Sequence, residues 1–347
     1  MTFSDSENFR CNICGVACGR LSAPPGREVP SCSACGSTVR LRSLIALLSR
    51  EIFGIELAIP DFPVLKGIRG FGMSDPPELA QRLAEKFEYT NTFYHQEPRI
   101  DVVNPGPEHL ARYDFILSSE VMEHVPPPVE RAFENLNRML KPDGLLLLTV
   151  PYRIDGHTAE HFPQLHEYAL ASPGGRTVLV NRRRDGSLEV FENLSFHGGD
   201  GSTLEMRVFT ETSLQKIIAG AGFTSVHIAS ENVGEFGVLH GETWSLPIVG
   251  RKGHFRVPVA EMAAAYGEIV GKAASLTQQF EDRTRWALAL QKEKETAVAD
   301  FHRVAAEEEE ARRHIQALEK QLVEAREAHT RIESNAWTRI GRKLGAV

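Results

Sequence analysis

One continuous stretch, residues 113–151, constrains the fold more than any other part of this chain. A short apolar run at 115–117 is followed by apolar residues at helical spacing from Val129 to Leu140, and then by the apolar run 145–150. Between the helix and the second run, Lys141-Pro142-Asp143-Gly144 forces a turn. A strand that is apolar on both faces is typical of a parallel sheet covered by helices on both sides. The stretch therefore predicts a βαβ unit in an α/β fold.

A polar cluster follows the first of these two strands. Its members are Ser118, Ser119, Glu120, Glu123 and His124. Open α/β sheets bind their ligands just outside the carboxyl ends of their strands. We therefore expect a ligand site at this loop.

Residues 118–125 (SSEVMEHV) and 138–151 (RMLKPDGLLLLTVP) resemble the S-adenosylmethionine-dependent methyltransferases of the Rossmann-like class. In that class a strand ends in a loop of the first kind, and a helix then leads through a turn of the second kind to the next strand. The resemblance implies a Rossmann-like methyltransferase sheet and S-adenosylmethionine as cofactor, with Ser118, Ser119 and Glu120 against it. An ordinary βαβ unit of another doubly wound protein is the alternative.

The same resemblance implies a glycine-rich turn after the first strand, where a side chain would collide with the cofactor. Within residues 64–72, Gly70 and Gly72 keep the family's spacing. Lys66 stands where the family has an acidic residue, and Ile68 replaces a glycine. A plain loop is the alternative.

The next expected elements are a helix that Asp75 caps and that continues to about residue 88, and a second strand within 89–94. Glu97 is the acid nearest to that strand's end, and the resemblance places it at the cofactor's ribose; an exposed loop glutamate is the alternative. Residues 100–103 are expected to form the third strand. Asp101 in it is similar in place to the family's acid near the adenine.

Five cysteines lie within the first 35 residues, and none follows. Four of them form two Cys-x2-Cys pairs, each followed by glycine: Cys11, Cys14, Cys32 and Cys35. Two residues between thiolates allow a tight turn that points both sulfurs at one tetrahedral metal ion. The spacing predicts a zinc ribbon over residues 1–40 with a structural zinc; two disulfides are the alternative. Cys18 is either a free thiol or a substitute for Cys14.

The segment after the second cysteine pair, 37–44, leads into an amphipathic helix that runs through Ile52. It resembles a Cys-Gly-Ser-x-x-Arg-x-Arg segment that joins a small zinc ribbon to a methyltransferase domain in a group of bacterial proteins. The resemblance implies a methyltransferase domain over residues 41–255. The ribbon would either recognise substrate or cap the edge of that domain.

Residues 152–209 interrupt the methyltransferase pattern, which resumes with a helix capped by 210–213 and strands at 225–229 and 244–249. The excursion contains a predicted hairpin that turns at Asp185-Gly186 between strands 177–180 and 188–191. In the methyltransferase fold an insertion at this place stands over the cofactor. We therefore expect a lid and acceptor site.

Candidate bases are numerous in this excursion. They are His157, His161, His166, His197, Glu160, Glu167 and Asp200. Methyl transfer depends chiefly on positioning, and it needs a base only when the acceptor is a hydroxyl of high pKa. We take His124 and His197 as the catalytic candidates; a surface or structural role is the alternative for each. The spacing of the histidines predicts no metal site among them.

Proline is absent after Pro258, and an apolar heptad pattern then continues for many repeats. Alternating steps of four and three reach Met262, Tyr266, Ile269, Ala273, Leu276, Phe280, Arg283, Ala287, Leu290, Lys294, Ala297, Phe301, Val304, Glu308, Ala311, Ile315, Leu318, Leu322, Ala325, His329, Ile332 and Ala336. Only four of these are polar or charged. The pattern predicts a coiled coil over residues 260–336 and a homo-oligomer; a lone solvated helix is the alternative.

The tail, residues 337–347, is basic with interleaved apolar residues, and it resembles endings that follow coiled coils in bacterial enzymes of surface-polysaccharide assembly. Contact with a membrane surface or partner helix, or a frayed helix end, are the alternatives. The formal net charge is −7, which provides no overall positive field for nucleic acid. No apolar run approaches the roughly 20 residues that span a bilayer, and the N-terminus lacks a signal-peptide pattern. We expect a cytoplasmic protein.

Together these features predict a methyltransferase with a structural zinc that methylates a hydroxyl of a sugar or surface glycan. Methylation of RNA or protein is one alternative. A catalytically inactive methyltransferase fold that serves as a scaffold is the other, suggested by Lys66, Ile68 and the coiled coil.

Overall fold

The computed structural model describes residues 8–19, 21, 23–197 and 203–345. The chain divides into two compact units, Met1–Ile269 and Val270–Val347. Each unit is described by itself.

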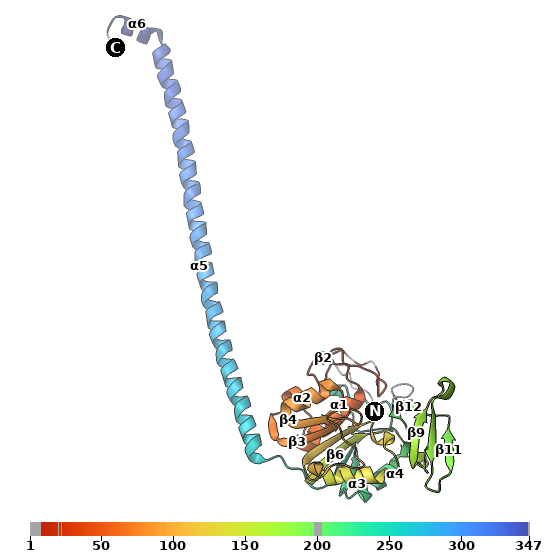
Figure 1. The fold of residues 1–347 in the computed structure, drawn as a ribbon. Helices are drawn as coiled ribbons and strands as arrows, with labels where there is room; N and C mark the ends of the chain where they lie inside the picture. Colours follow the sequence, from red (N-terminus) through yellow and green to blue (C-terminus); the bar gives the residue numbers. More distant parts are fainter. Residues whose placement is uncertain (1–7, 20, 22, 198–202, 346–347) are drawn as a thin grey trace. The chain divides into compact units, whose positions relative to one another are not determined.

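A six-stranded mixed sheet forms the centre of the first unit (Figure 1). Its strands are ordered β15-β16-β6-β5-β3-β4, and only β16 is antiparallel to its neighbours in this sheet. The strands are β3 (Leu65–Met73), β4 (Phe87–Thr92), β5 (Tyr113–Ser119), β6 (Leu140–Thr149), β15 (Ser225–Ile228) and β16 (Ile248–Arg251). The chain order reverses between β3 and β5. That pair is therefore the switch point at which such sheets bind ligands.

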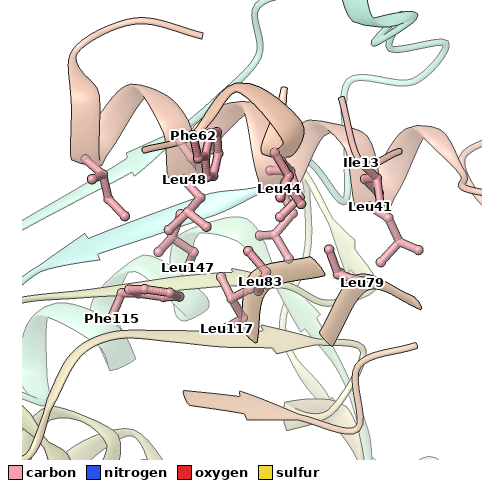
Figure 2. Close-up of a cluster of buried hydrophobic side chains, with 14 of the residues drawn as sticks. Ile13, Leu41, Leu44, Leu48, Phe62, Leu79, Leu83, Phe115, Leu117 and Leu147 are labelled. Atoms are coloured by element: carbon pink, nitrogen blue, oxygen red, sulfur yellow. The ribbon is translucent and has the colours of Figure 1, made fainter. Parts of the chain in front are cut away.

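Helices cover both faces of the sheet (Figure 1). On one face lie α1 (Val39–Phe53) and α2 (Pro77–Lys86), and on the other α3 (Glu130–Met139) and α4 (Glu211–Gly220). Figure 2 shows Leu44 and Leu48 of α1 and Leu83 of α2 among Phe115, Leu117 and Leu147 of the central strands.

Ile116 of β5 and Leu146 and Leu148 of β6 are the sequence neighbours of Phe115, Leu117 and Leu147. They belong to a second buried cluster with α3 and α4. Neighbouring residues of a strand point to opposite faces, so the two apolar runs bury both faces of the sheet. The predicted βαβ unit and the Rossmann-like α/β fold are confirmed.

Small elements surround this core. In the N-terminal region are β1 (Phe9–Arg10) and β2 (Ala17–Cys18), and the short 3-10 helices are η1 (Ile59–Asp61), η2 (Pro107–His109), η3 (Met122–His124), η4 (Pro173–Gly175) and η5 (Gly234–Phe236). The insertion after β6 contains β7 (Tyr152–Arg153), β8 (Ala159–Glu160), β9 (Glu167–Ala171), β10 (Val178–Arg182), β11 (Leu188–Phe191), β12 (Phe196–His197), β13 (Thr203–Leu204) and β14 (Arg207–Thr210). β10 and β11 are the predicted hairpin, and β9 completes a three-stranded sheet with them.

Two local predictions were wrong. Residues 100–103 do not form a third strand: a single parallel bridge joins Phe93 to Arg99, and the chain then turns because the carboxylate of Asp101 accepts the backbone N–H of Val103 at 2.9 Å. Asp75 does not cap α2, whose N-cap residue is Pro76 without a side-chain hydrogen bond. The Asp75 carboxylate is instead buried against Tyr89.

The N-terminal cysteine region is part of the main core. Phe9 and Ile13 belong to the same buried cluster as α1. Arg42 of α1 is fully buried, and its guanidinium donates hydrogen bonds to Ser31 Oγ at 2.8 Å and to the carbonyl of Gly237 at 3.0 Å. One side chain thus joins the cysteine region, α1 and the loop around η5.

The second unit consists of most of α5 (Val259–Ser334) and of α6 (Ala336–Lys343). α5 contains every heptad position except the last, Ala336, which begins α6. Ion pairs at i,i+4 spacing line it, such as Arg303 with Glu307 and Glu308 with Arg312. Among the described residues, no helix is both long and apolar enough to cross a membrane.

Candidate functional site

The four paired cysteines come together at one point. The Sγ atoms of Cys11 and Cys35 are 3.7 Å apart, those of Cys14 and Cys32 are 3.6 Å apart, and one ligand atom of each residue lies within 4.8 Å of the others. None of the four is in a disulfide. Four converging thiols can hold one tetrahedral ion and leave no position open for water.

Both cysteine pairs use the same turn. The N–H of Gly15 donates to the carbonyl of Cys11 at 2.8 Å, and the N–H of Gly36 donates to that of Cys32 at 3.0 Å. Both glycines have positive φ, +80° and +65°, which side chains rarely adopt. Cys18 lies outside the group of four, although its Sγ is 3.5 Å from that of Cys32.

The switch point of the sheet carries unusual backbone geometry. β3 is followed by Ser74 and β5 by Glu120, and both are non-glycine residues with positive φ, 61° and 56°. Such conformations cost about 1–3 kcal/mol each and cluster at functional sites. Both lie at the carboxyl edge, where the ligand of an open α/β sheet is expected.

Buried polar atoms without partners lie at the same edge. Ser118 Oγ and Asp75 Oδ1 are buried, and neither has a hydrogen-bond partner among the described residues. Burial raises the pKa of the Asp75 carboxyl to about 6, although a hydrogen bond from Tyr89 opposes this. Buried polar groups normally have partners, so these atoms fit a site that a polar ligand completes.

Gly70 and Gly72 lie inside β3 and not in a turn after it. A Cβ atom at Gly70 would be 2.3 Å from the ring of Phe115, and one at Gly72 would meet the Asp75 carboxylate and, at 2.2 Å, the hydroxyl of Tyr89. The expected glycine-rich turn is thus absent at these positions, and the protein's own side chains fill the space beside the two glycines. A valine at Gly70 would disturb packing before it could report on a cofactor.

The structure places the two predicted acids in loops beyond β4. Glu97 is exposed, and its carboxylate accepts the N–H of Arg99 at 3.0 Å. Asp101 uses its carboxylate in its own turn, with Val103 and Asn104 as donors.

Ser119 and Glu120 meet arginines from the N-terminal region. Arg27 donates to the two carboxylate oxygens of Glu120 at 2.6 and 3.2 Å, and Arg40 donates to Ser119 Oγ. Burial raises the pKa of the Glu120 carboxyl, but the hydrogen bond and charge of Arg27 and the charge of Arg40 outweigh it and lower the pKa overall. Glu120 is thus held as a carboxylate.

The two catalytic candidates, His124 and His197, lie together. Their rings are 4.7 Å apart, and both approach Glu123, at 3.5 Å from His124 Nε2 and 3.8 Å from His197 Nδ1. Glu205 accepts from His197 Nε2 at 3.0 Å and from His161 Nε2 at 2.9 Å. We call these five residues the histidine–glutamate cluster.

The insertion is fastened to η3 by a buried arginine. Arg207 of β14 is fully buried and donates to the carbonyls of Met122 at 3.0 Å and Val125 at 2.6 Å. It also pairs with Glu160 at 2.6 Å, so this candidate base has a structural partner. These contacts bring His197 and Glu205 of the insertion to His124 of the core.

The other predicted bases lie outside the cluster. His157, His166 and Glu167 are exposed, and Asp200 lies outside the described residues. Although the spacing of the histidines predicts no metal site, the structure brings Glu123, His124 and His197 together. Glu123 could have been chosen for its place beside His124. No local signal marks Arg27 or Glu205, which reach the site from distant segments.

Comparison with known proteins agrees with the α/β fold of the first unit. Residues 63–228 match the family model described as a methyltransferase domain. No curated protein matches the chain.

Solved structures that match are distant. The 1,6-didemethyltoxoflavin-N1-methyltransferase of Burkholderia thailandensis is 15% identical, with 71% of this chain and 99% of that chain covered and a TM-score of 0.34. The amino pentose methyltransferase CalS10 of Micromonospora echinaspora is 15% identical, with coverages of 62% and 92% and a TM-score of 0.34. The methyltransferase domain of the citrinin polyketide synthase is 15% identical, with coverages of 54% and 47% and a TM-score of 0.30. The chain thus spans less than half of this last protein, and likenesses of this size carry no argument about the acceptor.

Proposed function

We propose that this chain, an S-adenosylmethionine-dependent methyltransferase by its domain at residues 63–228, methylates a hydroxyl oxygen of a sugar or glycan. The observation that carries the proposal is the histidine–glutamate cluster, in which the insertion and the loop after β5 contribute to one polar site. Imidazoles and carboxylates are groups that hydrogen-bond hydroxyls and take up their protons.

The switch point of the sheet is where the cofactor would be held. When bound, S-adenosylmethionine supplies an electrophilic methyl group on a sulfonium. Ser118, Ser119 and Glu120 at the end of β5 and Asp75 after β3 offer polar groups at that edge, and two buried atoms there have no partner among the described residues. Glu97 and Asp101 are the candidates that the sequence provides for the ribose and adenine.

Loss of the acceptor's proton is the chemical task of the cluster. A sugar hydroxyl is a weak nucleophile while protonated, so a site that removes its proton raises the rate of transfer. His124 and His197 are the groups that we assign to this step. Glu205 and the carbonyl of Leu204 hold the two rings in place through their other nitrogens.

We further propose that Cys11, Cys14, Cys32 and Cys35 bind a structural zinc ion in the cytoplasm, where thiols stay reduced. Four thiolates and one Zn²⁺ leave a net negative charge, and the buried Arg42 lies close enough to offset it: Ser37 Oγ is 3.2 Å from both Cys11 Sγ and the Arg42 guanidinium.

Metal analysis tests the zinc site. Freshly prepared, unoxidised protein should contain one zinc per chain, and Cys11→Ser should lose it together with the local fold before residue 40. Cys18→Ser is the matched control and should keep the zinc, since its sulfur lies outside the group of four. Stoichiometric disulfides without zinc would reject the ribbon, and loss of zinc in Cys18→Ser would reveal a different ligand set.

Calorimetry tests the cofactor site. Wild-type protein should bind S-adenosylmethionine with micromolar affinity, roughly −8 kcal/mol. Asp75→Asn should weaken binding by roughly tenfold, about 1.4 kcal/mol, because it alters a buried carboxylate whose Oδ1 has no hydrogen-bond partner among the described residues.

Asp101→Asn is the comparison, since that carboxylate is engaged in its own turn. Loss of binding in Asp101→Asn, with binding kept in Asp75→Asn, would support the placement of Asp101 near the adenine that the sequence predicts. If the wild type gives no heat and no thermal shift at millimolar cofactor, the alternative of a catalytically inactive scaffold is favoured. The filled space beside Gly70 and Gly72 is consistent with that alternative.

An acceptor panel tests the reaction. We expect S-adenosylhomocysteine to accumulate with nucleotide sugars or oligosaccharides that carry free hydroxyls, and His197→Ala to lower kcat more than it lowers cofactor affinity. Matched acceptors that offer an amine or an activated carbon, and RNA or protein, are the comparisons. Transfer to one of these classes without transfer to hydroxyls would contradict the proposal.

We also propose that α5 assembles the chain into a homo-oligomer as a coiled coil. Large apolar residues of its heptad seam are exposed, among them Phe280, Leu290, Ile315, Leu318 and Leu322. A helix with a long apolar seam covers it with the same seam of another copy.

Light scattering tests the assembly. Leu318→Glu combined with Leu322→Glu should dissociate the oligomer, because buried unpaired carboxylates cost several kcal/mol. Alanine at Glu319 and Lys320, outside the seam, is the matched control. A monomeric wild type at micromolar concentration would exclude self-association.

A further inference from the structure

Three side chains of the types that ligate metals converge at the loop after β5. They are Glu123, His124 and His197, and one ligand atom of each lies within 4.8 Å of the other two. The site is distinct from the four cysteines, since no residue is shared. It combines two imidazoles with one carboxylate.

The hydrogen bonds at the far sides of the rings fix where their protons lie. His124 Nδ1 is 2.9 Å from the carbonyl oxygen of Leu204, which can only accept, so Nδ1 carries the proton and Nε2 presents its lone pair toward Glu123. His197 Nε2 is 3.0 Å from Glu205 Oε2, so its Nδ1 is the nitrogen that faces Glu123. Metal-bound histidines typically donate their second N–H to a carbonyl or carboxylate in this way.

The carboxyl group of Glu123 is the most buried of the three side chains. Glu123 is fully buried, and neither of its oxygens accepts a hydrogen bond from any described residue. A buried carboxylate without a partner is costly, and its cost rises when a lone pair such as that of His124 Nε2 faces it. A cation between the three groups would remove both penalties.

We propose that Glu123, His124 and His197 bind a divalent transition-metal cation. Two imidazole nitrogens and one carboxylate oxygen suit borderline ions such as Mn²⁺, Fe²⁺, Co²⁺ or Zn²⁺, and three protein ligands leave positions open. Leu204 and Glu205 act as positioning groups that orient the two rings.

The role of this cation rests on the proposed function. The open position receives the acceptor's hydroxyl, and the charge of the ion lowers the pKa of that hydroxyl. The O–H bond breaks and the proton leaves to solvent or to a nearby base. The oxygen then forms a bond to the methyl carbon of S-adenosylmethionine, and the carbon–sulfur pair stays on sulfur. With the ion bound, His124 and His197 assist the loss of the proton by holding the ion, and this inference refines the direct role that the proposed function gives them.

Cobalt binding to the full-length, zinc-loaded chain is the test. Co²⁺ in a nitrogen–oxygen site gives visible d–d absorption, whereas Co²⁺ on cysteine thiolates adds intense charge-transfer bands. We expect absorption of the first kind alone, saturating at one equivalent per chain. Saturation only with thiolate bands, or no saturable absorption, would overturn the proposal.

The variants separate a metal site from a structural cluster. His197→Ala should weaken Co²⁺ binding at least tenfold, while His166→Ala, an exposed histidine of the same insertion, should leave it unchanged. Glu123→Gln should abolish the rise in thermal midpoint that Co²⁺ produces in the zinc-loaded wild type, because the amide offers the ion no carboxylate ligand. Equal Co²⁺ affinity in wild type and His197→Ala would overturn the site.

Methyl transfer distinguishes this inference from the proposed function. Tight Co²⁺ binding in a chain that methylates no hydroxyl supports the site and rejects the proposed acceptor. Full methylation of a hydroxyl acceptor by protein that binds no Co²⁺ has the opposite meaning: the proposed function stands, and the metal site is rejected.

Discussion

The buried guanidinium of Arg42 is the interaction on which the arrangement of the N-terminal half depends. It donates to Ser31, Ser37 and Gly237, all of them neutral partners. Burying a cation among neutral groups costs several kcal/mol unless an opposite charge lies nearby. An anionic cluster of thiolates around a metal would provide that charge. Folding of the cysteine region and burial of this arginine would then stabilise each other.

The N-terminal region also contacts the carboxyl edge of the sheet, where a ligand is expected. Arg27 lies between the two cysteine pairs and Arg40 at the start of α1, yet both contact the loop after β5, at Glu120 and Ser119. The cysteine region thus contributes charged groups to the edge where a cofactor is expected. A chain in which this region is not folded would leave Glu120 without the arginine that holds it as a carboxylate.

Local patterns were sufficient for much of the fold. The βαβ unit followed from residues 113–151 because a buried strand and an amphipathic helix each have a local signature. The cysteine turns followed from spacing for the same reason. The third strand failed because Asp101 closes a turn with its own backbone. Gly70 and Gly72 lie inside β3 and not in a turn, beside Phe115, Tyr89 and Asp75, which only the folded sheet brings there.

The sequence alone predicts only some of the residues of the candidate site, and it does not predict which of them meet. His124 and His197 could be chosen by type, but their meeting depends on Arg207, which binds the carbonyls around η3 from the far end of the insertion. The core provides the buried Glu123, and the insertion provides His197 and Glu205. Neither half alone contains the complete histidine–glutamate cluster to which we assign the acceptor hydroxyl. A sheet that binds a common cofactor can therefore acquire a new acceptor by changing the insertion alone, provided that an anchor such as Arg207 keeps the two halves in contact.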